Sequence, residues 1–351
     1  MLRTRSRTRG GARLNPFATA SFFAPLTSSL GLSKGTGVAT FTRATTATVM
    51  GFAPGALPGD AQVLLSVAAG EARFSGARRI SAGVWSDYYA DGTLIPANLR
   101  LGYLSEVAAT NLFLNSAVGV TQTTPALTAA SYTLSFKGTG SIVATGGFVG
   151  TLTGTGASNR VSLTATATAA AAVLTVTGSI TEVMLNLGAL SSYIPTAGTA
   201  VARDADVDSY PTAGNIGTSG AVYLEFTRSG AGTAVLWSTF TDASNFVAIY
   251  IDPTYALIRK RVAGVNYDSS IAFTFISGNT YKLAARFGAG GQQISVSGVL
   301  GTANTNLSNA VIAGTMHVGS YNSALQPTAN IHNAGCWTPP LTDAQLQNVT
   351  T

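Results

Sequence analysis

The sequence predicts an all-β protein, and three observations favour that fold class. Short runs rich in Val, Thr, Ile and aromatic residues recur along the chain, with apolar side chains at alternate positions. Glycine is frequent, with 39 residues in 351, and often separates these runs. Hydrophobic residues make up 46% of the chain and charged residues only 10%, a balance too apolar for a disordered protein. The sequence contains no apolar run of 18 residues, so no membrane-spanning segment is predicted.

Residues 1–37 are predicted to form an irregular basic arm. The first thirteen residues contain no acid and carry arginine at five positions, Arg3, Arg5, Arg7, Arg9 and Arg13. Without these five, the 20 basic residues of the chain fall to 15, against 14 acidic residues. The arm is therefore expected to anchor the protein to an acidic surface of a neighbouring protein. Binding to nucleic acid phosphates is the less favoured alternative.

Residues 38–117 are predicted to be extended β-segments and linker, and not an independent globule. Val38–Val49 is rich in β-branched residues, and Val63–Val67 and Ala82–Ser86 are further short strand candidates. The Asp-Gly pair within Ala90–Thr93 is typical of a turn.

Residues 118–206 are predicted to form a small antiparallel β-sandwich. Ser131–Lys137 alternates cleanly and places Tyr132, Leu134 and Phe136 on one face. The later strand candidates are Arg160–Thr164, Ala172–Thr177 and Ile180–Leu185. Short strands divided by glycine-rich turns are typical of a sandwich.

Residues 207–351 are predicted to form a third unit, again built of strands. Ala221–Phe226 places Val222, Leu224 and Phe226 on one face. The strands expected after it are Thr233–Ser238, Asn245–Ile251, Ala256–Val262, Thr280–Phe287, Gln293–Val299, Thr315–Gly319 and Asn330–Trp337. A short C-terminal helix capped by Thr342 or Asp343 follows the Pro339-Pro340 pair.

Two segments resemble a joint found in tailed-bacteriophage virion proteins. The first, Leu101–Ser116, places Glu106 ahead of Thr-Asn-Leu-Phe-Leu-Asn-Ser. The second, Ser191–Asp206, contains Ser-Tyr-Ile-Pro-Thr and then Arg-Asp-Ala-Asp. In that family a laminin-G-like or concanavalin-A-like jelly roll follows the second segment. The "TYKLAARF", "SVSGV", "HVGS" and "LTDAQLQ" stretches of residues 207–351 are similar to that module. The resemblance covers residues 38–351 and implies a homotrimeric tail fibre or appendage.

The residues that could carry catalysis are few, and no catalytic residue or cofactor site is predicted. His317 and His332 lie in predicted strands without a carboxylate spaced to orient them. Jelly-roll glycosidases need two acidic groups on one face, whereas the first strand of the third unit offers only Glu225. The sequence has no Gly-x-Ser-x-Gly motif, phosphate loop or Cys/His metal cluster. Its single cysteine, Cys336, excludes an intramolecular disulfide and is expected to be a buried hydrophobe.

A ligand-binding rim is expected on the loops of the third unit, because a jelly roll holds variable loops on a rigid scaffold. The predicted rim residues are Asp242, Asn245, Tyr267, Asp268, Tyr321 and Asn322. Calcium bound by Asp242, Asn245 and Asp252 is an alternative use of these oxygens, and ordinary turn roles explain them as well. Arg259-Lys260-Arg261 is the basic patch of the body, with a solvated strand face as its default interpretation.

Together, these features predict a non-enzymatic structural protein of a phage particle, with the virion as its location. Its expected partners are other virion proteins, further copies of the chain and a host cell-surface glycan. A capsid decoration protein is the first alternative, and a secreted lectin or glycan-active enzyme is the second. The missing acidic pair disfavours the enzyme.

Overall fold

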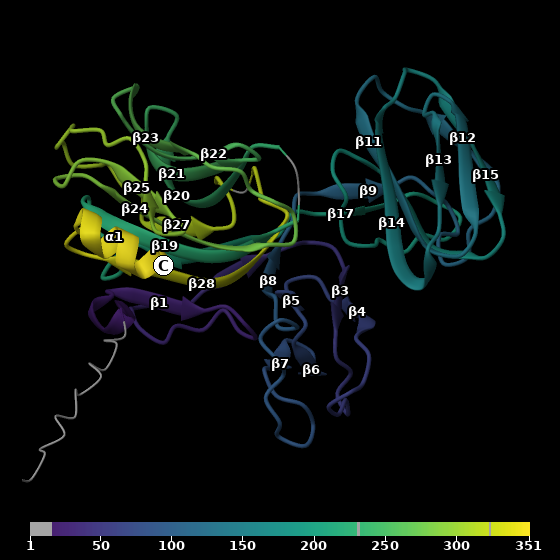
Figure 1. Cartoon of the computed structure of the whole chain (residues 1–351), viewed down its shortest axis with the longest axis horizontal. Coiled ribbons are helices and arrows are strands. Elements are labelled where there is room, and N and C mark those ends of the chain that lie inside the picture. Colours follow the sequence, from purple (N-terminus) through teal and green to yellow (C-terminus); the bar gives the residue numbers. More distant parts are fainter. Residues whose placement is uncertain (1–15, 230–231, 323) are drawn as a thin grey trace, which may run out of the picture.

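A computed structural model describes residues 16–229, 232–322 and 324–351 of the chain. The described chain is almost entirely β-structure and confirms the predicted all-β class. Three parts are visible in Figure 1: a large jelly roll, a small sandwich to one side, and a hairpin-rich region below. Among the described residues, no helix has the length and apolar character needed to cross a membrane.

The jelly roll consists of two antiparallel sheets packed face to face. One sheet has the order β26 (Val299–Leu300), β25 (Gln293–Val296), β24 (Thr280–Phe287), β19 (Gly220–Arg228), β28 (Ala329–Trp337), β8 (Gly102–Ser105) and β5 (Phe74–Ser75), with β1 (Phe22–Pro25) beside β28. The other has the order β2 (Thr40–Thr42), β18 (Val207–Pro211), β27 (Thr315–Val318), β20 (Ala234–Asp242), β21 (Asn245–Asp252), β22 (Tyr255–Val262) and β23 (Val265–Ala272). Val222, Leu224 and Phe226 share the buried face of β19, as their alternation predicts.

The two outer faces of the jelly roll differ. Helix α1 (Asp343–Thr350) packs Leu346 against Tyr223 and Trp337 on the outer face of the first sheet. Thr342 is the N-cap of this helix, with a capping box completed by Gln345, so the predicted cap is confirmed. The 3₁₀ turn η1 (Pro16–Thr19) covers the same face with Phe17, whose ring stacks on Trp337.

The jelly roll takes strands from far outside the range 207–351 predicted for it. Strand β1 lies in the range 1–37 predicted as an arm, and it pairs along β28 with Phe22 opposite Cys336. Strands β2, β5 and β8 lie in the range 38–117 predicted as linker, yet they extend both sheets. These strands are short and lack clear alternation, so their own sequence carries little signal of the sheets that they join.

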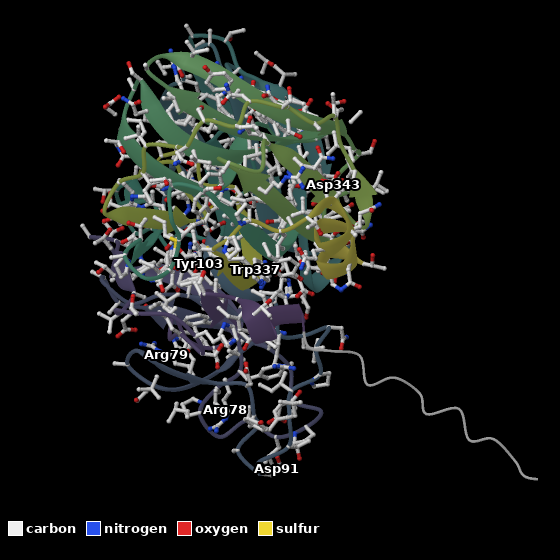
Figure 2. All side chains as sticks on the ribbon, turned by 90° about the vertical axis from the view of Figure 1, so that its left-hand side faces the viewer. Arg78, Arg79, Asp91, Tyr103, Trp337 and Asp343 are labelled. Atoms are coloured by element: carbon white, nitrogen blue, oxygen red, sulfur yellow. The ribbon has the colours of Figure 1, made fainter. Side chains whose placement is uncertain are left out.

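Residues 47–99, apart from strand β5, form the hairpin subdomain, which lies beside the jelly roll. It contains the hairpins β3 (Ala47–Gly51) with β4 (Val63–Val67) and β6 (Arg78–Ser81) with β7 (Val84–Ser86). Phe52, Ala56, Tyr89 and Ile95 form a small buried core within it. In Figure 2, Arg78, Arg79 and Asp91 mark this subdomain, and Tyr103 lies where it meets the jelly roll.

The small sandwich consists of two sheets around a core that includes Tyr132, Leu134 and Phe136. One sheet has the order β10 (Gln122–Ala126), β15 (Ala171–Thr177), β12 (Ser141–Gly146) and β13 (Gly150–Thr153). The other has the order β14 (Gly156–Thr166), β11 (Ser131–Gly138) and β16 (Ile180–Leu187). The chain enters through β9 (Ala109–Asn111) and leaves through β17 (Val201–Arg203), and these two strands pair with each other.

Candidate functional site

The two segments that carry the phage resemblance lie side by side in the structure. Strand β9 belongs to the first segment and β17 to the second, and Arg203 pairs with Ala109 across the ladder. The 74 residues from 117 to 190 separate the two segments along the chain, so their contact is tertiary. The segments form the joint between the small sandwich, the hairpin subdomain and the jelly roll, which we call the junction.

At the centre of the junction is a buried cluster of three arginines and two acids. Arg43 Nη1 lies 2.9 Å from Asp206 Oδ1, and Arg73 forms ion pairs with both Asp206 and Glu106, the latter at 2.8 Å. Arg203 Nη1 lies 3.4 Å from Asp206, and its Nη2 lies 3.5 Å from Glu106. All five side chains are at most 4% exposed. Buried charges require such pairing, because desolvation of an unpaired ion is costly.

The cluster fixes the charge state of its members. Burial alone would raise the pKa of Glu106, but Arg203, Arg73 and hydrogen bonds from Ser192 lower it to about 2. Burial likewise opposes the charge of Arg73, but Asp206 and Glu106 raise its pKa above the ordinary value. Glu106 is therefore a carboxylate at neutral pH and has no proton to donate as a general acid.

The remaining matched residues join the two segments by hydrogen bonds. Asn111 is fully buried, and its Nδ2 donates to Val183 O at 2.9 Å and Ile194 O at 2.8 Å. The Tyr193 hydroxyl lies 2.8 Å from Ser116 Oγ, which also accepts a hydrogen bond from Thr196 N. The motif residues Asn111, Ser116, Tyr193 and Thr196 thus have a structural role, which accounts for their residue types.

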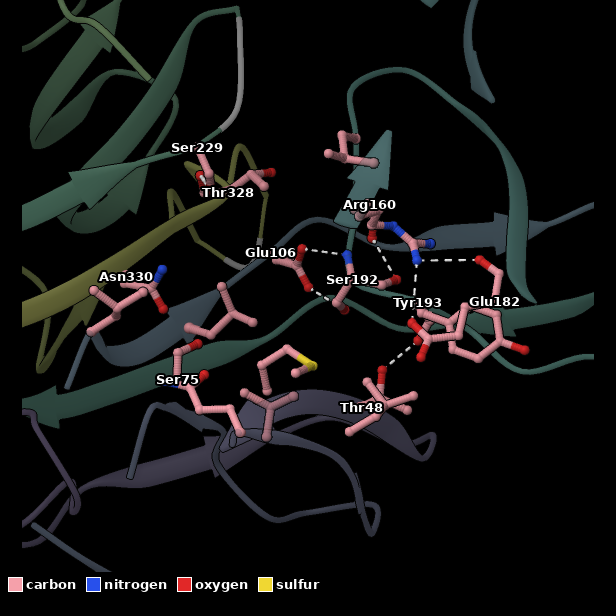
Figure 3. A pocket seen from close by; sticks show the side chains of 18 of the residues that line it. Thr48, Ser75, Glu106, Arg160, Glu182, Ser192, Tyr193, Ser229, Thr328 and Asn330 are labelled. Atoms are coloured by element: carbon pink, nitrogen blue, oxygen red, sulfur yellow. Dashed lines mark hydrogen bonds and ion pairs between the residues drawn. The ribbon is translucent and has the colours of Figure 1, made fainter. Parts of the chain in front are cut away.

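A cavity of about 250 Å³ opens beside the junction, bounded by all three parts of the molecule. Figure 3 shows Glu106 and Ser192 at its centre, Arg160 and Glu182 on the side of the small sandwich, and Asn330 on the side of the jelly roll. Glu106 accepts hydrogen bonds from the Ser192 amide at 2.8 Å and from its hydroxyl at 2.6 Å. This volume is below the roughly 300–1,000 Å³ of typical small-molecule sites.

The acids that line the cavity are held by cations. Glu182 pairs with Lys137 Nζ at 3.0 Å and with Arg160 Nη1 at 3.5 Å, and the Arg160 guanidinium lies 5.6 Å from the Tyr193 ring centre. Burial lowers the pKa of Arg160, and Glu182 partly offsets this effect. The cavity therefore presents paired charges, which is an arrangement suited to holding three parts of a chain together.

Two of the predicted rim residues, Asp242 and Asn245, stabilise a turn by hydrogen bonds. Asp242 ends β20 and accepts hydrogen bonds from Ser244 N at 2.7 Å and Asn245 Nδ2 at 3.1 Å. Asn245 Oδ1 in turn accepts from Ala263 N at 3.0 Å. Asp252, the third residue of the alternative calcium site, accepts hydrogen bonds from the hydroxyl groups of Thr233 and Thr254. Within the described residues, no group of three or more His, Cys, Asp or Glu side chains is arranged to hold a metal.

Two other rim residues, Asp268 and Tyr321, belong to one cluster on the outer face of the seven-stranded sheet. Arg259 Nη2 lies 2.7 Å from Asp268, and its guanidinium lies 5.9 Å from the Tyr250 ring centre. The ring centre of Tyr321 lies 6.1 Å from that of Tyr250 and 5.1 Å from that of Phe240. We call this set (Phe240, Phe246, Tyr250, Arg259, Asp268 and Tyr321) the aromatic face.

Phe240, Phe246 and Tyr250 of the aromatic face were not among the predicted rim residues. Alternation in β21 places Val247, Ile249 and Ile251 in the core and Phe246 and Tyr250 on the other side. That pattern was visible in the sequence, but Phe240 reaches the cluster only through the pairing of β20 with β21. Asn322 follows Tyr321 with φ of 45°, a left-handed conformation that asparagine tolerates in turns.

Tyr267 lies on the opposite face of the same sheet. It pairs with Lys260, whose Nζ lies 4.9 Å from the Tyr267 ring centre. Lys260 is fully buried and donates to Asn306 Oδ1 at 2.8 Å and to Ser308 O at 2.6 Å, and burial lowers its pKa to about 8. The predicted basic patch is therefore divided, with Arg259 facing outward and Lys260 inward.

Other predicted features have ordinary packing roles or lie outside the described residues. Cys336 is buried without a disulfide, as predicted, and burial raises the pKa of its thiol. His332 Nε2 lies 2.9 Å from Thr227 Oγ1, and burial lowers the pKa of both His317 and His332. The predicted anchor residues Arg3, Arg5, Arg7, Arg9 and Arg13 lie outside the described residues.

Comparison with known proteins yields only distant similarities. No protein-family model matches the chain, and no curated protein matches it. Among solved structures, it is similar to the CBM40 domain of the Ruminococcus gnavus IT-sialidase bound to α2,3-sialyllactose, with 14% identity over 38% of this chain and 83% of that one and a TM-score of 0.33. It is also similar to domain 4 of the arabinanase AbnA from Geobacillus stearothermophilus, with 14% identity over 42% of this chain and 73% of that one and a TM-score of 0.35. A third similar structure is a SAP-like pentraxin of Limulus polyphemus, with 14% identity over 38% of this chain and 70% of that one and a TM-score of 0.30. Similarities of this strength carry no argument about function.

Proposed function

We propose that this chain is a non-enzymatic structural protein of a tailed-bacteriophage particle, a tail fibre or head appendage. In this role the residues before β1 attach it to another virion protein and the jelly roll faces outward. One observation carries the proposal. The residues that make both segments resemble phage proteins, including Glu106, Asn111, Tyr193, Arg203 and Asp206, are brought together in one buried junction. Two chance matches separated by 74 residues would have no reason to interlock.

The structure supports a joint more than an active site at this place. Glu106, with its pKa held at about 2, and its partner arginines are buried and paired. Glu225, the acid on the first strand of the predicted jelly roll, accepts hydrogen bonds from Asn333 Nδ2 at 2.7 Å and Tyr223 at 3.4 Å. Neither position supplies the two free carboxyl groups, about 5–10 Å apart, that glycoside hydrolysis needs.

A glycan is the surface ligand that we assign to the aromatic face. Partly exposed tyrosine rings can stack on the apolar face of a sugar, and the Arg259–Asp268 pair offers donors and acceptors for its hydroxyl groups. Burial and the nearby Tyr321 raise the pKa of Tyr250 to about 12, so its phenol remains a hydrogen-bond donor at neutral pH. This assignment also fits a secreted lectin, so particle association must be tested separately.

Particle association is tested by purifying phage particles through a density gradient and measuring this chain by quantitative mass spectrometry. We expect a fixed number of copies for each copy of the major capsid protein. A few copies on each particle indicate a tail fibre or appendage, whereas hundreds indicate the capsid decoration alternative. Recovery only in the particle-free supernatant would contradict a virion role.

Glycan binding is tested by titrating host surface polysaccharide against the wild type and the double variant Y250A/Y321A. We expect the variant to bind at least tenfold more weakly. Y88A is the matched control, because Tyr88 is 51% exposed on the hairpin subdomain, away from the jelly roll. Equal binding by all three proteins would rule out the aromatic face as the site. Release of shorter saccharides by the wild type would contradict the non-enzymatic assignment.

A further inference from the structure

The small sandwich has an unusual distribution of charge. Between Glu106 and Glu182 the sequence contains only two charged residues, Lys137 and Arg160. Both lie on the sheet β14–β11–β16, paired with each other across the ladder, and both line the junction cavity together with Glu182. Soluble domains carry about 25% charged residues, so solvation by charge is nearly absent from this unit.

The four-stranded sheet β10–β15–β12–β13 therefore presents an outer face without any charge. Its exposed side chains alternate with the core residues Ile142, Ala144 and Leu174, as the strand period requires. They are Thr123, Val143, Thr145, Thr151, Thr153, Ala171, Val173, Thr175 and Thr177. In Figure 1, β12 and β15 lie at the end of the small sandwich farthest from the jelly roll, so no other described part of the chain covers this face.

The edges of this sheet are protected, in contrast to its face. Strand β10 contains Pro125, which cannot donate to a ladder, and its register with β15 is irregular between Thr123 and Ala126. Strand β13 has only four residues. Proline, bulges and short strands are the devices by which proteins prevent edge-to-edge pairing. A partner is thereby directed to pack on the face of the sheet.

We propose that the outer face of the β10–β15–β12–β13 sheet is the surface through which copies of this chain associate. A face without charge offers no electrostatic complementarity to a charged protein, a nucleic acid or an acidic glycan. A second copy of the same face meets it without like-charge repulsion. Small Thr, Val and Ala side chains on a flat sheet also allow close face-to-face packing of two sheets, about 10 Å apart. Packing of one such face on another joins two copies, which gives a dimer in place of the trimer that the phage resemblance implies, and it does not depend on a virion role.

The test introduces charge at the centre of the face. Val143 and Val173 lie on the neighbouring strands β12 and β15 and are 42% and 40% exposed, so V143K/V173K is expected to fold like the wild type. V299K is the matched control, because Val299 is 54% exposed on β26 of the jelly roll. Mass is measured by light scattering over a hundredfold range of concentration, and folding is checked by thermal unfolding.

We expect the wild type and V299K to be oligomers and V143K/V173K to have the 35.7 kDa mass of one chain. Burying an unpaired ammonium group opposes association, so we expect the dissociation constant of V143K/V173K to rise at least tenfold. A wild type that remains monomeric at every concentration would overturn the proposal. An oligomeric V143K/V173K would also overturn it, because the copies would then associate through another surface.

A bismaleimide reagent provides a second readout: T145C should cross-link between copies, whereas V299C should not. Cross-linking of V299C alone would count against this face.

Discussion

Replacing Glu106 by glutamine is expected to lower the free energy of unfolding by about 3 kcal/mol at pH 7. The pKa of Glu106 is about 2, against 4.5 for an unperturbed glutamate, and each pH unit of displacement corresponds to about 1.4 kcal/mol. The change also leaves Arg73 and Arg203 with Asp206 as their remaining acidic partner in the cluster. Breaking one member of a buried ion pair costs about 3–5 kcal/mol, which agrees with this value.

The pH dependence of this loss provides an internal check. Because the pKa of Glu106 is lowered on folding, its stabilisation is fully present above about pH 4.5 and disappears as the pH falls towards 2. The difference between the wild type and E106Q should therefore shrink below pH 4.5. The matched control is E71Q, which removes the partly exposed Glu71–Arg79 pair and should cost less than about 1 kcal/mol.

Urea denaturation followed by tryptophan fluorescence measures both variants. Trp85, Trp237 and Trp337 all lie outside the small sandwich, so the signal reports the jelly roll and the hairpin subdomain. Limited proteolysis measures in parallel whether the small sandwich separates from the rest. If E106Q lost no more stability than E71Q, the buried cluster would not be the element that holds the junction together.

Three further predictions test other parts of the structure. Asp208 is fully buried, and burial raises its pKa well above the ordinary value, an effect that interactions with Tyr210 and the Ser209 backbone only partly offset. A carboxyl group whose pKa is raised on folding lowers the stability of the protein as the pH rises above about 4. In urea denaturation, D208N should therefore be more stable than the wild type at pH 7 and equally stable at pH 4. F22A should cost about 3–5 kcal/mol in the same assay, because Phe22 is 1% exposed in the jelly-roll core, and a loss below 1 kcal/mol would contradict the assignment of β1 to this sheet. T342A should lower the stability by about 1 kcal/mol through loss of the α1 cap, whereas T342S, which keeps the hydroxyl, should not.

The sequence was a good guide to strands with strong alternation. The faces of β11 and β19 followed directly from Tyr132, Leu134 and Phe136 and from Val222, Leu224 and Phe226. In both cases the apolar period of two residues is set by the local backbone, so it can be recognised without knowing the partner strand.

The junction and the added strands could not be predicted in the same way. Gly102–Ser105 becomes strand β8 because it pairs with β28, and Phe74–Ser75 becomes strand β5 because it pairs with β8. Arg43 and Arg73 reach Asp206 only after the chain has folded back on itself. Apart from the pairing of β5 with β8, these contacts join residues more than 100 positions apart, which no local pattern encodes. The predicted rim grouped Tyr267 with Asp268 and Tyr321, whereas Tyr267 lies on the opposite face of the sheet beside Lys260. Strand register decides the face of each side chain and was unknown from the sequence.

Immunogold electron microscopy of purified particles tests the proposed virion role most directly. An antibody against the jelly roll is the appropriate probe, because this unit is expected to face outward. We expect gold at a fixed place on intact particles, at the tail or at a head appendage, without disruption of the particle. Gold absent from intact particles, while the same antibody detects the free protein in the lysate, would contradict the virion assignment and favour a secreted glycan-binding protein.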